Sequence, residues 1–186
     1  MRVISGKARG TKLNSIESLA TRPTLDRVKE SLFNMIQGKI DDSTVLDLFA
    51  GSGAIGIECI SRGAKKAYFC EKSQEAAKMI YQNLEKTKFL NNAIVIQKDY
   101  KKGLKMLKEK EITFDIVYID PPYQEDIAVE AVKQILELDS LKKDGIIIIE
   151  TDDEQRELKE LEKLNLNVYD LRKYGRVHLM FLNRKE

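Results

Sequence analysis

The sequence is poor in the residues that build disulfide or metal scaffolds, with two cysteines, one histidine and three prolines among 186 residues. Cys59 lies in a helical pattern and Cys70 in a strand pattern, where thiols usually behave as small buried hydrophobes. Two such cysteines provide neither a disulfide framework nor metal-ligand spacing. His178 has no partner in the surrounding sequence that would make it a catalytic base. We therefore expect no metal in this protein.

Long apolar runs are also missing. No stretch approaches the roughly 20 residues that span a bilayer, and residues 1–7 lack the apolar core of a secretory signal. The composition, 42% hydrophobic and 33% charged, is that of an ordinary soluble protein. We expect a cytoplasmic protein without membrane contact, in which an N-terminal arm and helix (1–40) pack on one α/β domain (41–186).

Basic side chains are concentrated at the N-terminus. Residues 1–30 hold seven basic and three acidic side chains, a balance of +4, whereas the rest of the chain has a balance of −2. A basic arm on a mildly acidic body is suited to holding the phosphates of a nucleic acid. A solvated terminus with a chance surplus of charge is the alternative. The phosphate-binding candidates are Arg2, Lys7, Arg9 and Lys12, with Arg176 from a later turn.

Strand and helix patterns alternate from residue 45 onward, which predicts a parallel sheet with helices on both faces. A helix precedes the sheet; Thr24 can cap it, it begins near Leu25, and Gly38 ends it. Two final strand patterns, separated by Tyr174-Gly175-Arg176, form a hairpin. The predicted strands are 45–49, 67–70, 93–97, 114–119, 146–150, 167–173 and 177–183, and the later helices are 54–62, 74–87, 101–108, 127–138 and 154–164.

A glycine-rich loop follows the first of these strands. Residues 45–49 run into Ala50-Gly51-Ser52-Gly53, where glycines let the backbone turn tightly and approach a ligand. The spacing of Gly51, Gly53 and Gly56, with Glu71 twenty residues after Gly51, also fits the dinucleotide fingerprint. Spacing alone therefore leaves an NAD-dependent oxidoreductase open.

Asp47 distinguishes a dinucleotide from S-adenosylmethionine as the ligand of this loop. Its carboxylate, four residues before the first glycine, would repel a pyrophosphate. S-adenosylmethionine has no phosphate and presents an ammonium and a sulfonium, both cationic. Asp47 therefore favours the methyl donor, with a solvated strand-end acid or a helix cap as the alternative.

A second motif, Asp120-Pro121-Pro122-Tyr123, follows the apolar run 114–119. Two adjacent prolines end the strand and fix the backbone, so a carboxylate, a backbone carbonyl and an aromatic ring can be held together. A planar aromatic amine can stack on such a ring while its NH2 group donates to the two oxygens. The alternative is a tight turn after a core strand.

Together these segments resemble the Rossmann-like S-adenosylmethionine-dependent methyltransferases with a D/N-P-P-Y/F motif, and in particular the RsmD family, which methylates the N2 amine of a guanine in 16S ribosomal RNA. The resemblance rests on five stretches spread along the chain: 2–10 (RVISGKARG), 22–30 (RPTLDRVKE), 47–56 (DLFAGSGAIG), 120–123 (DPPY) and 174–175 (YG). It implies a seven-stranded, mostly parallel sheet with an antiparallel last strand.

Open parallel sheets bind ligands at the carboxyl ends of their strands, and this rule predicts roles for individual residues. The donor is expected to contact Asp47 with its ammonium, the loop residues Phe49, Ala50, Gly51, Ser52 and Gly53 with its carboxylate end, Glu71 with its ribose, and Asp99 and Tyr100 with its adenine. Arg22 and Thr24 are expected to close the pocket, with a role only in the helix start as the alternative, and a helix cap is the alternative for Asp99. Asp120, Pro121, Pro122 and Tyr123 are the expected catalytic residues, with Tyr123 stacking on a flipped base.

The expected substrate is 16S ribosomal RNA, within a 30S assembly particle, and the expected state is a monomer. Three alternatives stay open at this point. They are an adenine-N6 or other amino-methyltransferase on RNA or DNA, an NAD-binding oxidoreductase, and a noncatalytic RNA-binding assembly protein.

Overall fold

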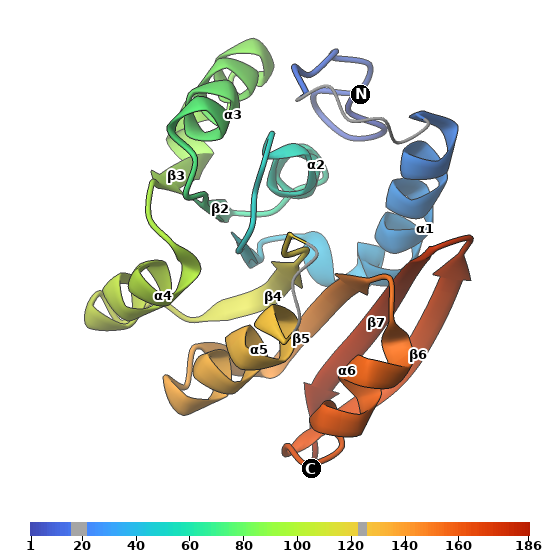
Figure 1. Cartoon of the computed structure of the whole chain (residues 1–186). Coiled ribbons are helices and arrows are strands. Elements are labelled where there is room, and N and C mark those ends of the chain that lie inside the picture. The colour runs from blue at the N-terminus through green and yellow to red at the C-terminus, as the bar shows by residue number, and fades with distance from the viewer. Residues whose placement is uncertain (16–21, 123–125) are drawn as a thin grey trace.

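The computed structural model describes residues 1–15, 22–122 and 126–186, and for residues 22–25 the backbone alone. In the described residues seven strands form one sheet in the order β3-β2-β1-β4-β5-β7-β6 (Figure 1). The strands are β1 (Thr44–Asp47), β2 (Lys66–Cys70), β3 (Ala93–Ile96), β4 (Phe114–Ile119), β5 (Leu141–Thr151), β6 (Leu166–Tyr174) and β7 (Val177–Arg184). The helices are α1 (Arg22–Ile40), α2 (Ala54–Ser61), α3 (Gln74–Thr87), α4 (Tyr100–Glu109), α5 (Ile127–Glu137) and α6 (Glu154–Leu161), with a short 3₁₀ helix at Leu90–Asn92.

The pairing of the strands confirms the expected fold class. β1 pairs in parallel with β2 and β4, β2 with β3, and β4 with β5. β7 runs antiparallel to both of its neighbours, β5 and β6. The strand order reverses between β1 and β4, which is the place where open α/β sheets bind ligands outside the carboxyl ends of the strands.

Side chains of each strand alternate between two apolar layers. In β4, Ile116 and Tyr118 belong to the core layer with α1, α2 and α3, whereas Val117 and Ile119 belong to the layer with α4, α5 and α6. This alternation follows from the period of two in a strand. Figure 1 shows the two groups of helices on opposite faces of the sheet.

The first helix differs from the prediction at both ends. The structure begins α1 at Arg22 instead of near Leu25, and the helix continues past Gly38 to Ile40. Ile36 and Ile40 are buried against the sheet, so packing of the last turn outweighs the weak helix propensity of one glycine. The bounds of α3 and β4 agree with the prediction.

The N-terminal arm folds back on itself like a hairpin. Arg2 and Lys12 form an antiparallel bridge, and Val3 and Leu13 are buried in the layer that holds α1 to α3. The arm lies beside α2 and α3 (Figure 1). Gly6 has φ +85°, and a Cβ there would lie 1.8 Å from the carbonyl oxygen of Ser61, so only glycine permits this approach of the arm to α2.

The second hairpin, β6–β7, turns at Gly175, whose φ of +62° explains the glycine at this position. The hydroxyl of Tyr174, at the end of β6, hydrogen-bonds the hydroxyl of Ser31 on α1. Among the described residues, no helix has both the length and the apolar character required to cross a membrane.

Candidate active site

A cavity of about 210 Å³ opens at the carboxyl ends of β1, β4 and β5. One wall comes from the glycine loop after β1, another from the ends of β4 and β5, and a third from α1. The arm reaches the same cavity through Met1. The lining residues are Met1, Asp26, Val28, Lys29, Leu32, Asp47, Phe49, Ala50, Gly51, Ser52, Ala54, Ile55, Tyr118, Asp120 and Glu150.

The glycine loop takes its shape from left-handed backbone conformations. Gly51 has φ +55° and Gly53 has φ +78°, both in the region that side chains other than glycine rarely adopt. Gly53 directly precedes α2. A Cβ at Gly56 would lie 2.3 Å from Cε1 of Phe69, so this glycine allows α2 to pack closely on β2. The loop therefore directs its backbone at the cavity while the helix stays on the sheet.

Asp47, the last residue of β1, is only 2% exposed although it lines the cavity. Its Oδ2 atom accepts a hydrogen bond of 3.2 Å from the backbone N–H of Gly56. Desolvation by burial raises the pKa of Asp47 to about 7; the Gly56 bond opposes this shift and the charge of Glu71 adds to it. A cation in the cavity would reverse much of this desolvation cost, because the buried carboxylate has no basic side-chain partner among the described residues.

Asp120 faces the same cavity from the end of β4. Desolvation by surrounding atoms, then the charges of Glu150 and Asp47, raise the pKa of Asp120 above its ordinary value. The side chain keeps contact with solvent, and water limits the size of that shift. Pro121 is partly buried and Pro122 is exposed, while Tyr123 lies outside the described residues.

Glu150 adds another carboxylate to the cavity, at the end of β5. The buried hydroxyl of Tyr118 donates a hydrogen bond to its Oε2 atom. Desolvation, then the charges of Glu150 and Asp120, raise the pKa of Tyr118 well above its usual value, so this hydroxyl keeps its proton. The tyrosine therefore acts as a fixed donor that orients Glu150.

Four predicted cofactor residues lie beside the cavity without lining it: Gly53, Glu71, Asp99 and Tyr100. Glu71 accepts hydrogen bonds of 2.8 Å from the backbone N–H groups of Gly51 and Ser73, so it supports the glycine loop. Tyr100 packs against Phe49, with ring centroids 5.2 Å apart. Asp99 caps α4 by accepting from the N–H groups of its first turn, the alternative use of an aspartate at such a position. The side chains of Arg22 and Thr24 lie outside the described residues.

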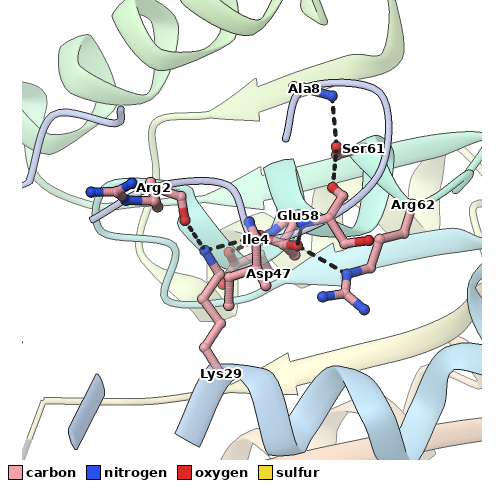
Figure 2. A network of polar contacts seen from close by, with 10 residues as sticks. Arg2, Ile4, Ala8, Lys29, Asp47, Glu58, Ser61 and Arg62 are labelled. Carbon is pink, nitrogen blue, oxygen red and sulfur yellow. Dashed lines mark hydrogen bonds and ion pairs between the residues drawn. The ribbon is translucent and has the colours of Figure 1, made fainter. Parts of the chain in front are cut away.

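The arm is attached to the body by a buried carboxylate. Glu58 on α2 is 0% exposed and accepts from the backbone N–H groups of Ile4 and Ser5, at 2.9 Å each. Its other partners are Lys29 Nζ at 3.0 Å and Arg62 Nε at 2.9 Å. Figure 2 shows the arm, Lys29 and Arg62 converging on this side chain. Each oxygen of Glu58 thus accepts from one backbone amide and one cation.

A second buried side chain joins the arm to the glycine loop. Asn83 on α3 accepts a 2.7 Å hydrogen bond from the backbone N–H of Asn14 and donates to the carbonyls of Asn14 and Ser52, at 2.9 Å each. Sequence reasoning missed Asn83 and Glu58, because a polar residue inside a helical pattern gives no signal of its partners. It also missed Glu150, although that residue ends a predicted strand at the same sheet edge as Asp47 and Asp120.

The predicted RNA-binding residues are exposed: Arg2, Lys7, Arg9, Lys12 and Arg176. In the part of the chain that the structure describes, none of them forms an ion pair. His178 contacts Glu154, away from the cavity. Within the same described residues, no group of three or more histidine, cysteine or acidic side chains is placed to hold a metal ion.

Comparison with known proteins gives consistent matches. The family described as "Conserved hypothetical protein 95" matches residues 1–183. The chain is 39% identical to Ribosomal RNA small subunit methyltransferase D of Haemophilus influenzae over 82% of this chain and 79% of that protein. It is 34% identical to the protein of the same name from Escherichia coli K12, over 82% and 75%. The solved structure of yhhF from Escherichia coli has a TM-score of 0.81 and 28% identity, covering 100% of this chain and 98% of that one.

The sheet with its antiparallel last strand, and the cavity between the glycine loop and the end of β4, define a Rossmann-like methyltransferase. The chain is an enzyme of this class. It belongs to the family described as "Conserved hypothetical protein 95", the RsmD family, which confirms the resemblance drawn from the sequence.

Proposed function

We propose that this protein transfers the methyl group of S-adenosylmethionine to the exocyclic N2 amine of a guanine in 16S ribosomal RNA. The observation that supports it is that one cavity is lined by Asp47, by residues 49–52 of the glycine loop and by Asp120. The names of the similar proteins, which specify the small ribosomal subunit, support the choice of RNA. We further propose that the enzyme acts as a monomer, in the cytoplasm, on a 30S assembly particle.

The cavity residues fit S-adenosylmethionine, which supplies an electrophilic methyl group on a sulfonium. Asp47 pairs with the donor's ammonium, a cation that the buried carboxylate lacks among its described contacts. The left-handed conformations of Gly51 and Gly53 let the loop backbone approach the donor's carboxylate. Glu71 retains unused lone pairs for the ribose hydroxyls after binding the Gly51 and Ser73 amides. Beyond these, Asp99 and Tyr100 contact the adenine, and Arg22 and Thr24 close the pocket.

The acceptor side is built on Asp120. Its carboxylate and the carbonyl of Pro121 orient the guanine NH2 group, whose lone pair is otherwise delocalised into the ring. The bound donor would supply the methyl group to N2, with the electrons of the broken S–C bond staying on sulfur, and the proton that N2 then loses would pass to Asp120 or to water. Asp120 stabilises the positive charge that develops on the nitrogen. Tyr123 stacks on the flipped base.

The direct test is transfer of a tritiated methyl group to small-subunit ribosomal RNA and particles from cells that lack the protein, with the product mapped by mass spectrometry. N2-methylguanosine at one nucleotide is expected. Label on an adenine would replace the proposal with the adenine-N6 alternative. Binding of RNA without any transfer would favour an assembly protein. Titration with NADH and with S-adenosylhomocysteine distinguishes an NAD-binding oxidoreductase, which would bind NADH, from a methyltransferase, which would bind S-adenosylhomocysteine.

Binding of S-adenosylhomocysteine should depend on pH through Asp47. The donor's ammonium pairs with the ionised carboxylate, and burial raises the pKa of Asp47 to about 7 in the free protein. Protonation of Asp47 below pH 7 then competes with binding. The dissociation constant of S-adenosylhomocysteine should therefore rise about tenfold for each unit by which the pH falls below 7. Calorimetry between pH 5.5 and 8.5 measures this slope.

The matched variant for this experiment is Asp47→Asn. It should bind S-adenosylhomocysteine weakly and with little dependence on pH, because its amide cannot titrate. An equal slope in the two proteins would contradict the assignment of Asp47.

Charge reversal in the arm should weaken RNA binding. In Arg9→Glu/Lys12→Glu, two exposed cations that contact phosphates are lost, so the slope of log affinity against log salt should fall by about one unit per lost contact. Lys159→Glu/Lys163→Glu, with one change on α6 and one just after it, is the matched control, because α6 packs on the opposite face of the sheet. Filter binding at several salt concentrations measures both. A salt slope equal to that of the control would remove the arm from the RNA interface.

A further inference from the structure

Glu150 and Asp120 stand side by side at the site. Ile119 pairs with Ile149 in the parallel register of β4 and β5, so the next residues, Asp120 and Glu150, occupy equivalent positions at the ends of neighbouring strands. Both line the cavity. The preceding pair, Tyr118 and Ile148, faces the layer of α1 to α3, and strand alternation places the two carboxylates on that same face.

One carboxylate oxygen of Glu150 is held by Tyr118, and the other is available to a ligand. The Tyr118 hydroxyl donates to Oε2, and within the described residues no hydrogen bond involves Oε1. Desolvation raises the pKa of Glu150 while the Tyr118 bond lowers it, so the tyrosine favours the ionised carboxylate. Among the described residues, the other charged side chains that line this cavity are those of Asp26, Lys29 and Asp47, and Met1, which carries the N-terminal ammonium, lines it as well. Asp120 and Glu150 together present two neighbouring acceptors and no donor.

Two neighbouring acceptors match the Watson–Crick edge of guanine. Guanine presents its N2 amine next to N1–H, which gives two donors in a row. Adenine presents its N6 amine next to N1, which has a lone pair and no hydrogen. A carboxylate beside that position accepts from guanine and repels adenine, and a buried polar group left unpaired costs about 1–3 kcal/mol.

We infer that Glu150 accepts the N1–H of the target base while Asp120 accepts from the amine, and that Glu150 is the residue that selects guanine over adenine. This inference rests on the proposed methyl transfer to a base amine. It assigns to Glu150 a role in base specificity that is separate from the positioning of the amine by Asp120.

The test compares guanosine with 2-aminopurine riboside at the methylated nucleotide. The analogue keeps the N2 amine but lacks both N1–H and the O6 carbonyl, so the change in preference between the wild-type protein and Glu150→Gln is what reports on the N1 contact. Each nucleoside is introduced into full-length small-subunit ribosomal RNA by splinted ligation and assembled with the small-subunit proteins. We expect the wild-type kcat/KM to favour guanosine by about 100-fold or more.

Glu150→Gln should narrow this preference to about tenfold or less, because the glutamine amide can donate to a lone pair or accept from N1–H. Its affinity for S-adenosylhomocysteine should not change. Glu130→Gln, the same substitution on an exposed residue of α5, is the control and should keep the wild-type preference. Tyr118→Phe leaves the carboxylate in place without its donor and should reduce the preference in part.

Three results would overturn the inference. Equal methylation of the two nucleosides by the wild-type protein does so without any variant, whether or not Glu150→Gln folds. An unchanged preference in folded Glu150→Gln does so while leaving the proposed function intact. Label on adenine in place of guanine, in the wild-type protein, would overturn the proposed function as well.

Discussion

Asp120→Ala is expected to lower the rate of methyl transfer by about 10²–10³-fold, the usual cost of losing one group that stabilises a transition state. The alanine leaves the amine without its acceptor and the developing charge on nitrogen without a counterion. Binding of S-adenosylhomocysteine should stay close to wild type, because the glycine loop and Asp47 are untouched. Single-turnover transfer of labelled methyl and calorimetry measure the two quantities.

Asp120→Asn distinguishes positioning from proton removal. Its amide oxygen still accepts from the amine, so a rate well above that of Asp120→Ala would assign a positioning role. A rate as low as that of Asp120→Ala would show that methyl transfer depends on the charge or the basicity of the carboxylate. Asp152→Ala, at an exposed aspartate just after β5, is the control and should retain normal turnover. Near-normal turnover in Asp120→Ala would remove Asp120 from the catalytic site.

Glu58→Gln is expected to destabilise the protein by about 3–5 kcal/mol, the cost of removing one partner from a buried ion pair. Lys29 would lose its counterion while 5% exposed, and one of the two arm amides would face an NH2 group. The arm should then separate from α2 before the sheet unfolds. Urea denaturation measures the overall loss, and hydrogen exchange at Ile4 and Ser5 measures the local one.

The control for this prediction is Glu160→Gln, which removes an acidic partner from the exposed pair with Lys163. Exposed pairs contribute about 0–1 kcal/mol, so little change in stability is expected. If Glu58→Gln and Glu160→Gln had the same stability and the same hydrogen exchange at Ile4 and Ser5, the contacts of Glu58 would not be what holds the arm on the body. Because Lys29 also lines the cavity, detachment of the arm should reduce methyl transfer as well.

Local patterns were sufficient for most of the fold. The apolar run 114–119 and the helical period of 74–87 predicted β4 and α3 with the bounds that the structure shows. β5 was predicted from residue 146, yet it begins at Leu141. That early part depends on the pairing of Leu141 with Phe114, followed by a shift of register, and a contact of this kind has no periodic signal in the sequence.

The sequence by itself determined the alternation of strands and helices. It also determined that Asp47 and Asp120 lie at the same edge of the sheet, because parallel strands bring their carboxyl ends to one edge. The tertiary structure alone decided which distant groups complete the site. Glu58 contacts Ile4 across 54 residues, and Asn83 contacts Asn14 across 69. Such contacts arise from how α1, α2, α3 and the arm pack together, and packing depends on the shape and burial of whole surfaces instead of on local periodicity.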